Sequence, residues 1–216
     1  MQASYLSKRF VIVAGKGGVG KSTACAALGL AAARKGKRVI IAELNTREKA
    51  PLFFGKPESG YQAQQIAENL YSINIQPEPA LREYGLRKLR LKLLYDRIFE
   101  SAAMKKLLRM IPGMNELLLL GKAFDLEREV DRQGKPVWDM VIVDAPATGH
   151  GVSLLRLPEV ILNVSSTGAM ADEARLMRAL LTDAQRTVIH LVTLPEEMPV
   201  RETLELKAQV ENVLRI

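Results

Sequence analysis

The residues best suited to chemistry form one glycine-rich run near the N-terminus: Gly15, Lys16, Gly17, Gly18, Val19, Gly20, Lys21, Ser22 and Thr23. This run fits the spacing G-x-x-x-x-G-K-[ST], in which glycines let successive backbone N–H groups point at phosphate oxygens. The helix expected after it adds the positive end of its dipole. We predict that Lys21 reaches the β and γ phosphates of a nucleotide and that the Ser22 hydroxyl binds Mg²⁺ directly.

A carboxylate for the same metal ion is expected at Asp144. This residue ends the apolar run Met140–Val143, which predicts a buried strand. A carboxylate at the carboxyl end of a parallel strand can orient the water shell of Mg²⁺ beside a phosphate loop. We therefore predict that Asp144 binds the ion through water.

Strands and helices alternate around these residues, as is typical of a parallel sheet covered on both faces. We expect strands at 10–14, 38–43, 70–75, 139–143 and 187–193, and helices at 21–35, across 78–132, and from Pro195 and Pro199 to the end. The pattern predicts an α/β, doubly wound, mainly parallel sheet. We interpret residues 1–216 as a single domain with a helical insertion at roughly 78–133.

Composition excludes several other classes of protein. The 216 residues are 48% apolar, which is too much for a disordered chain. No uncharged run approaches the roughly 18 residues that cross a membrane. The single cysteine, Cys25, excludes an internal disulfide and a cysteine-built zinc site within one chain. A reducing, cytoplasmic setting is the simplest interpretation.

Positive charge is concentrated in residues 81–110. This stretch carries +6 of the net charge of +7. A protein that binds nucleic acid over its whole surface is therefore not expected, and we predict no specific nucleic-acid partner. Two interpretations of the stretch stay open: a solvated face, or a surface for an anionic membrane or an acidic partner.

Further motifs carry a family resemblance that spans about residues 10–210. Asp144–His150 reads D-A-P-A-T-G-H, and Leu154–Pro158, Ile111–Glu116 and Leu194–Thr203 follow related patterns. Together they resemble the arsenite-pump and tail-anchored-protein-targeting ATPases (ArsA/GET type), which are P-loop NTPases. The T-G-H and P-G-M-N-E segments separate this family from the related partitioning and positioning ATPases, which remain a further alternative.

The resemblance implies a function and a second catalytic lysine. Lys16, directly after the first glycine, makes the loop the deviant kind (deviant Walker A), whose extra lysine reaches the partner's nucleotide across a dimer interface. Such a protein binds ATP and Mg²⁺, hydrolyses ATP to ADP and phosphate, and thereby controls a protein client. We expect a cytoplasmic homodimer, or a heterodimer with a paralogue, with peripheral membrane association left open. The alternative for Lys16 is a solvated loop lysine.

The chain departs from this family at the first switch. Asn45 stands where the family has an Asp that positions or activates the attacking water. We assign Lys16, Asn45 and Asp144 as the catalytic set and expect weak hydrolysis, because an amide cannot accept a proton. Glu43 or Glu48 could replace the acid, or Asn45 could be a helix N-cap with no role in chemistry. A weakly or non-hydrolysing subunit, paired with an active paralogue, is the alternative function.

Two further expectations follow from the resemblance. In the targeting factors, the region equivalent to residues 81–120 forms an apolar groove for a client, so we predict a protein client or membrane-associated partner there. The alternative is that these apolar residues pack on the domain's own core. The family also continues beyond the position of Ile216 with a strand and helices that supply much of the adenine pocket, so we expect either a shortened product or a missing last part.

Overall fold

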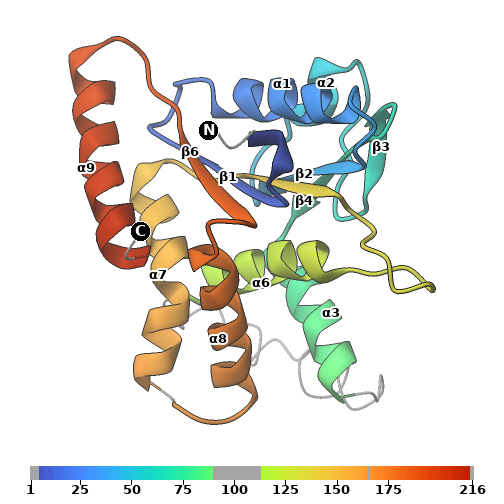
Figure 1. The fold of residues 1–216 in the computed structure, drawn as a ribbon, viewed down its shortest axis with the longest axis vertical. Coiled ribbons are helices and arrows are strands. Elements are labelled where there is room, and N and C mark those ends of the chain that lie inside the picture. Colours follow the sequence, from blue (N-terminus) through green and yellow to red (C-terminus); the bar gives the residue numbers. More distant parts are fainter. Residues whose placement is uncertain (1–4, 90–112, 165, 215–216) are drawn as a thin grey trace.

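The computed structural model describes residues 5–89, 113–164 and 166–214. A six-stranded sheet forms the centre, in the order β3-β4-β2-β5-β1-β6 (Figure 1). The strands are β1 (Phe10–Ala14), β2 (Val39–Leu44), β3 (Gln64–Ala67), β4 (Leu70–Ile75), β5 (Met140–Asp144) and β6 (Thr187–Leu191). All neighbours pair in parallel except β3, which is antiparallel to β4 at the edge. The predicted α/β class with a mainly parallel sheet is confirmed.

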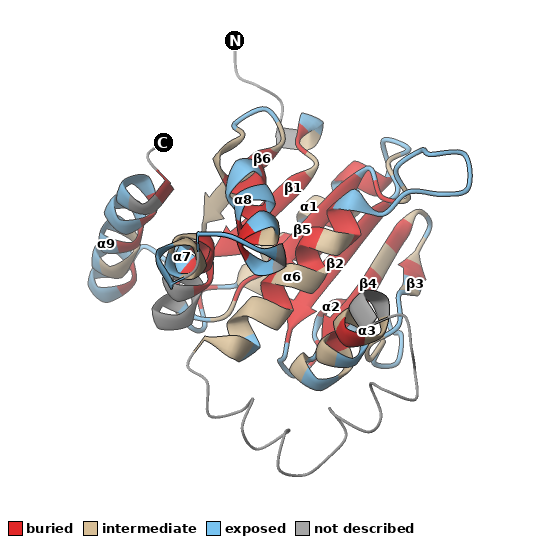
Figure 2. Ribbon diagram, turned by 90° about the horizontal axis from the view of Figure 1, so that it is seen from below, coloured by how far each residue is buried: buried red, intermediate tan, exposed pale blue. Residues whose placement is uncertain are grey.

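Helices cover both faces of this sheet. They are α1 (Lys21–Ala33), α2 (Ala50–Phe53), α3 (Pro77–Leu89), α6 (Met114–Arg128), α7 (Thr148–Val164), α8 (Ala169–Thr182) and α9 (Glu197–Leu214), and a 3₁₀ turn at Tyr5–Ser7 precedes β1. In Figure 1, α1 and α2 lie on one side of the sheet and α6, α7 and α8 on the other. The buried strands appear between them in Figure 2.

Alternation along β1 explains the two layers. Phe10 and Ile12 face the core shared with α6, α7 and α8, whereas Val11 and Val13 face the core under α1. All five residues of β1 are buried, because side chains of a central strand meet a helix layer on either face. Helix α1 packs close to the sheet at Gly29, where an added Cβ would stand 2.9 Å from a Leu70 methyl group.

The strand register brings three functional segments to one edge. Asp144 at the end of β5 is level with Val13 of β1 and with Glu43 of β2. The phosphate loop follows β1 directly and the Asn45 segment follows β2 directly. The carboxyl ends of neighbouring parallel strands therefore place loop, acid and first switch side by side, as expected for open α/β sheets.

The sequence prediction missed several elements. It contained neither β3 nor the helices α7 and α8. It placed Pro199 before the last helix, but α9 begins at Glu197 and includes this proline in its first turn. A proline is tolerated there because N–H groups of the first turn have no partner within the helix.

Only part of the predicted helical insertion lies within the described residues. Helices α3 and α6 belong to it, and residues 90–112 lie outside the description. Helix α6 buries Leu120 and Phe124 in the core of the sheet, so this helix is a layer of the main domain. A separate helical subdomain at 78–133 stays a prediction.

Candidate active site

The phosphate loop has a backbone that only glycines allow. A Cβ at Gly15 would overlap the carbonyl oxygen of Val192. Gly18 and Gly20 have φ of 87° and 93°, in the left-handed region, and nothing lies within 4 Å of where their Cβ would be. Gly20 is the N-cap of α1, so the loop delivers the chain directly into the N-terminus of this helix. The loop therefore leaves an open concave surface in front of a helix N-terminus, as a phosphate site requires.

Lys21 folds back over this loop. Its Nζ donates hydrogen bonds to the carbonyl oxygens of Gly15, at 3.1 Å, and Lys16, at 2.9 Å. Burial lowers the pKa of Lys21, whereas the negative charge of Asp144 raises it. Both contacts are with backbone oxygens, which a phosphate oxygen can replace without breaking an ion pair.

Ser22 and Asp144 meet beside Lys21. The Ser22 hydroxyl donates a hydrogen bond of 2.6 Å to Oδ2 of Asp144. Burial raises the pKa of Asp144, while the Ser22 hydrogen bond and the Lys21 charge lower it. A hydroxyl and a carboxylate are the hard oxygen groups that Mg²⁺ prefers. The structure thus places together the two residues that the sequence predicts for the metal.

A polar cavity of about 520 Å³ opens at this edge of the sheet. It is lined by Gly18, Gly20, Lys21, Ser22, Thr23, Leu44, Asn45, Thr46, Lys49, Phe53, Asp144, Ala145, Pro146 and Ala147. Among the predicted site residues, Gly15, Lys16, Gly17 and Val19 do not line it. The cavity collects the N-terminus of α1, the end of β5 and the segment after β2 in one place.

Lys16 turns away from this cavity. Its Nζ forms an ion pair with Glu202 of α9, and both side chains are about 30% exposed. The ammonium group therefore does not serve the phosphate loop of its own chain here. The sequence does not indicate this contact, because the two residues are 186 positions apart.

Asn45 lines the cavity from the end of β2. Its φ is 47°, a left-handed conformation that asparagine adopts more readily than most residues. Its N–H donates to the carbonyl oxygen of Ile75, at 2.8 Å. The N-cap hypothesis for Asn45 is wrong, because the next helix, α2, begins at Ala50 and has Lys49 as its N-cap.

The two glutamates considered as replacement acids both hold backbone. Glu43 is fully buried and accepts a hydrogen bond of 2.7 Å from the N–H of Lys49, with a longer one from the N–H of Ala50. Glu48 is 3% exposed and accepts hydrogen bonds from the N–H groups of residues 59 and 60. Neither residue lines the cavity. Glu43 thus fixes the end of the loop after β2, and Glu48 connects this loop to residues 59 and 60.

We expect the Glu43→Gln variant to lose a pH dependence of stability. Burial raises the pKa of Glu43 from 4.5 to about 7. Between these values the folded chain holds a proton that the unfolded chain has released, so the free energy of unfolding falls as pH rises through this window. The variant's free energy of unfolding, measured in urea, should rise relative to wild type by about 1–3 kcal/mol from pH 4.5 to pH 8.

A constant difference between Glu43→Gln and wild type across this range would contradict the buried-acid account.

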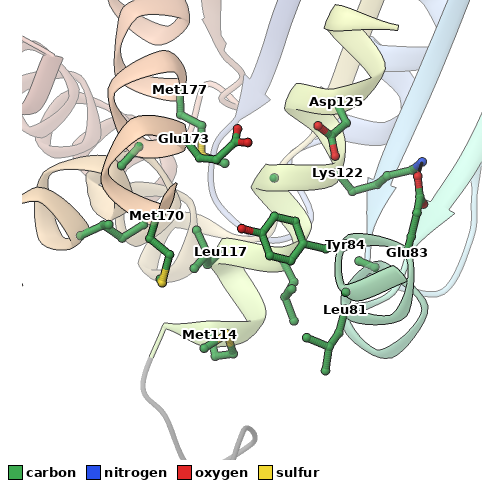
Figure 3. Close-up of a pocket in the computed structure, with 16 residues that line it drawn as sticks. Leu81, Glu83, Tyr84, Met114, Leu117, Lys122, Asp125, Met170, Glu173 and Met177 are labelled. Carbon is green, nitrogen blue, oxygen red and sulfur yellow. Dashed lines mark hydrogen bonds and ion pairs between the residues drawn. The ribbon is translucent and has the colours of Figure 1, made fainter. Parts of the chain in front are cut away.

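A second cavity lies between α3, α6, α7 and α8, on the face of the sheet that α6, α7 and α8 cover. It has a volume of about 260 Å³ and a mostly apolar lining, with Met114, Met170 and Met177 among the residues that Figure 3 labels. An ion pair between Lys122 Nζ and Glu83 Oε1, at 2.7 Å, lies at its edge. Its lining combines residues of α3 and α6, the helices before and after residues 90–112 in the sequence, with residues of α8.

The predicted apolar groove at 81–120 is described only in part. Leu117 and Leu118 line the apolar cavity, whereas Leu119 and Leu120 are buried in the main core. Within α6, the groove interpretation therefore fits Leu117 and Leu118, and the core interpretation fits Leu119 and Leu120. The apolar positions between 90 and 112, and most of the basic residues of 81–110, lie outside the described residues.

Lys49 is a site residue that the sequence does not reveal. This lysine lines the polar cavity beside Asn45 and Asp144. No motif marks it, because an exposed lysine in a short loop has no distinctive pattern. Its position follows only from the way the chain turns after β2.

The fold and the site together define an α/β protein with a P-loop and a polar cavity at the carboxyl edge of a mainly parallel sheet. Residues 8–166 match the family described as anion-transporting ATPase (ArsA), and the chain belongs to this family. Curated relatives agree. The chain is 33% identical over 208 residues to the ATPase BagA of Mycobacterium tuberculosis, covering 91% of this chain and 59% of the relative.

More distant relatives extend the comparison. A putative arsenical pump-driving ATPase of Chlorobaculum tepidum is 25% identical over 238 residues, covering 91% of this chain and 56% of the relative. The ATPase ASNA1 homolog 1 of Paramecium tetraurelia is 30% identical over 158 residues, covering 71% of this chain and 44% of the relative. The chain thus spans somewhat over half the length of the first of these relatives.

Within residues 5–89, 113–164 and 166–214, no helix combines the length and the apolar character needed to cross a bilayer.

Proposed function

We propose that this chain is the nucleotide-binding part of a dimeric, Mg-ATP-dependent switch that hydrolyses ATP to ADP and phosphate. The observation that carries the proposal is the Ser22–Asp144 hydrogen bond of 2.6 Å inside the cavity that Lys21 also lines. It joins a helix N-terminus, a metal-binding hydroxyl and a strand-end carboxylate at one point. The membership of the ArsA family supports the use of ATP.

The residues present fit Mg-ATP. Gly18 and Gly20 leave open space where a side chain would fill the loop. In the proposed complex the Ser22 oxygen is a direct ligand of Mg²⁺, and Asp144 orients water molecules around the ion. When bound, the ion neutralises charge on the phosphate oxygens. Lys21 exchanges its two carbonyl partners for phosphate oxygens, and the N–H groups of the loop donate to the same phosphates.

Catalysis in this proposal is completed across the dimer. Lys16 leaves Glu202 and brings its charge to the nucleotide of the second subunit, where negative charge spreads during phosphoryl transfer. ATP would then favour the closed dimer and hydrolysis would release it, because the terminal phosphate holds both the first switch at Asn45 and the segment that begins at Asp144. A protein client would respond through the α3–α6 side, where the apolar cavity lies.

Asn45 favours a second candidate function, a weakly or non-hydrolysing subunit that pairs with an active paralogue. The segment after β2 places an amide in the cavity, and the buried carboxylates of Glu43 and Glu48 are both engaged with backbone. The described lining of the cavity therefore contains one carboxylate, Asp144. A paralogue with Asp at this position could supply an active site of its own.

The Asp144→Asn variant tests the metal part of the proposal. We expect its apparent affinity for Mg²⁺, measured from the Mg²⁺ dependence of ATP binding, to fall about 10-fold. The amide keeps the size of the side chain but loses the charge that orients the water shell of the ion.

Asp139, an exposed acid just before β5, provides the matched control. Its carboxylate accepts the N–H of Arg38, far from the cavity, so Asp139→Asn should leave the Mg²⁺ affinity unchanged. Equal Mg²⁺ dependence in wild type and Asp144→Asn would contradict the proposed metal site.

A further inference from the structure

The loop after β2 is fixed to the sheet by several backbone contacts. The N–H of Asn45 donates to Ile75, and the carbonyl oxygen of Thr46 accepts a hydrogen bond of 2.8 Å from the side-chain amide of Asn74. The N–H of Lys49 then donates to Glu43, at 2.7 Å. Five residues are thus held at their beginning and at their end, so the backbone of Lys49 has a defined position.

A fully buried acid serves to place this one residue. Glu43 is 0% exposed, and its carboxylate oxygens accept the N–H groups of Lys49 and Ala50. Burying a carboxylate is costly unless hydrogen bonds compensate it. Ala50 is also buried, whereas Lys49, the residue before it, is exposed to solvent. The anchor therefore fixes the backbone and leaves the ammonium group free to meet a ligand.

Lys49 lines the polar cavity, and its charge acts on the other charged groups there. Its positive charge lowers the pKa of both Lys21 and Asp144. The charged side chains of the described lining are Lys21, Lys49 and Asp144, which leaves the cavity with an excess of positive charge. An aspartate in place of Asn45 would have balanced it.

We propose that Lys49 is a second phosphate-binding lysine of the same chain, which contacts the terminal phosphate of ATP and makes the site prefer a triphosphate to a diphosphate. The proposal rests on the proposed ATP site. Lys49 lines the cavity together with Asn45 and Asp144, the residue that would orient the water shell of Mg²⁺. A nucleoside triphosphate remains anionic after it binds one Mg²⁺, so it matches the excess positive charge.

Comparing the affinities for two nucleotides tests this role. The dissociation constants of the non-hydrolysable triphosphate AMP-PNP and of ADP are measured by calorimetry with Mg²⁺ on the full chain. Lys49→Ala should weaken AMP-PNP about 10-fold or more and ADP less than about 2-fold, as expected for loss of one charge-assisted contact to the terminal phosphate. Lys49→Arg should restore most of the AMP-PNP affinity, because it returns the charge.

Arg47 gives the matched control on the same loop. It is exposed and does not line the cavity, so Arg47→Ala should bind both nucleotides as wild type does. Unchanged AMP-PNP affinity in Lys49→Ala, or an equal loss of affinity for AMP-PNP and ADP, would overturn the proposed role of Lys49. The ATP site itself is tested separately by the Lys21→Ala variant. Failure of the wild-type chain to bind either nucleotide would overturn both.

Discussion

The Lys21→Ala variant is expected to bind Mg-ATP at least about 100-fold more weakly than wild type. Lys21 is the cation that faces the phosphate loop from within, with its Nζ held over the carbonyl oxygens of Gly15 and Lys16. The alanine variant loses a charge-assisted contact to the phosphates, and its methyl side chain forms no contact in its place. Titration of a fluorescent ATP analogue in the presence of Mg²⁺ measures the change.

The same experiment needs proof that the variant is folded. The described partners of Lys21 Nζ are two loop carbonyl oxygens, so its loss should leave the circular dichroism spectrum unchanged. Lys35, exposed just after α1, provides the control, and Lys35→Ala should bind as wild type does. Wild-type affinity in a folded Lys21→Ala protein would contradict the assignment of the phosphate loop.

The Lys16→Ala variant is expected to lose about 1,000-fold in turnover while its nucleotide affinity changes little. Lys16 forms an ion pair with Glu202 and does not line its own cavity, so bound nucleotide in the same chain gains little from it. A cation supplied to the partner's nucleotide acts mainly where charge develops in the transition state. Phosphate release and nucleotide binding, measured on the same samples, separate the two effects.

Mixing two inactive variants makes this test sharper. A mixed dimer of Lys16→Ala and Lys21→Ala has one complete site, in which the first variant binds ATP through Lys21 and the second supplies Lys16. Turnover should therefore reappear when the two proteins are combined. No recovery, together with equal losses of binding and turnover in Lys16→Ala, would contradict catalysis across the interface.

Local patterns were sufficient to predict most of the sheet and the proximity of Ser22 to Asp144. The runs Phe10–Ala14 and Leu70–Ile75 form strands with the predicted bounds, because each is a short apolar or alternating stretch closed by glycine or proline. Asp144 could be paired with Ser22 because parallel strands end at one edge. These inferences depend on neighbours in sequence or on a general rule of topology.

Features that depend on tertiary structure were missed. The strand β3 at Gln64–Ala67 is short and polar and becomes a strand only by pairing with β4. Lys49 enters the cavity because Glu43 holds its backbone, and Lys16 meets Glu202 across most of the chain. The N-cap hypothesis for Asn45 failed because the loop after β2 runs further than expected before α2 begins.

We propose that this chain forms a Mg-ATP-hydrolysing site completed by a second copy. The most direct measurement is Mg-ATP turnover as a function of protein concentration, with nucleotide binding measured in the same samples. We predict that specific activity rises with protein concentration and reaches a plateau as dimers form. Firm nucleotide binding with no turnover at any concentration would contradict it and favour a subunit that needs an active paralogue.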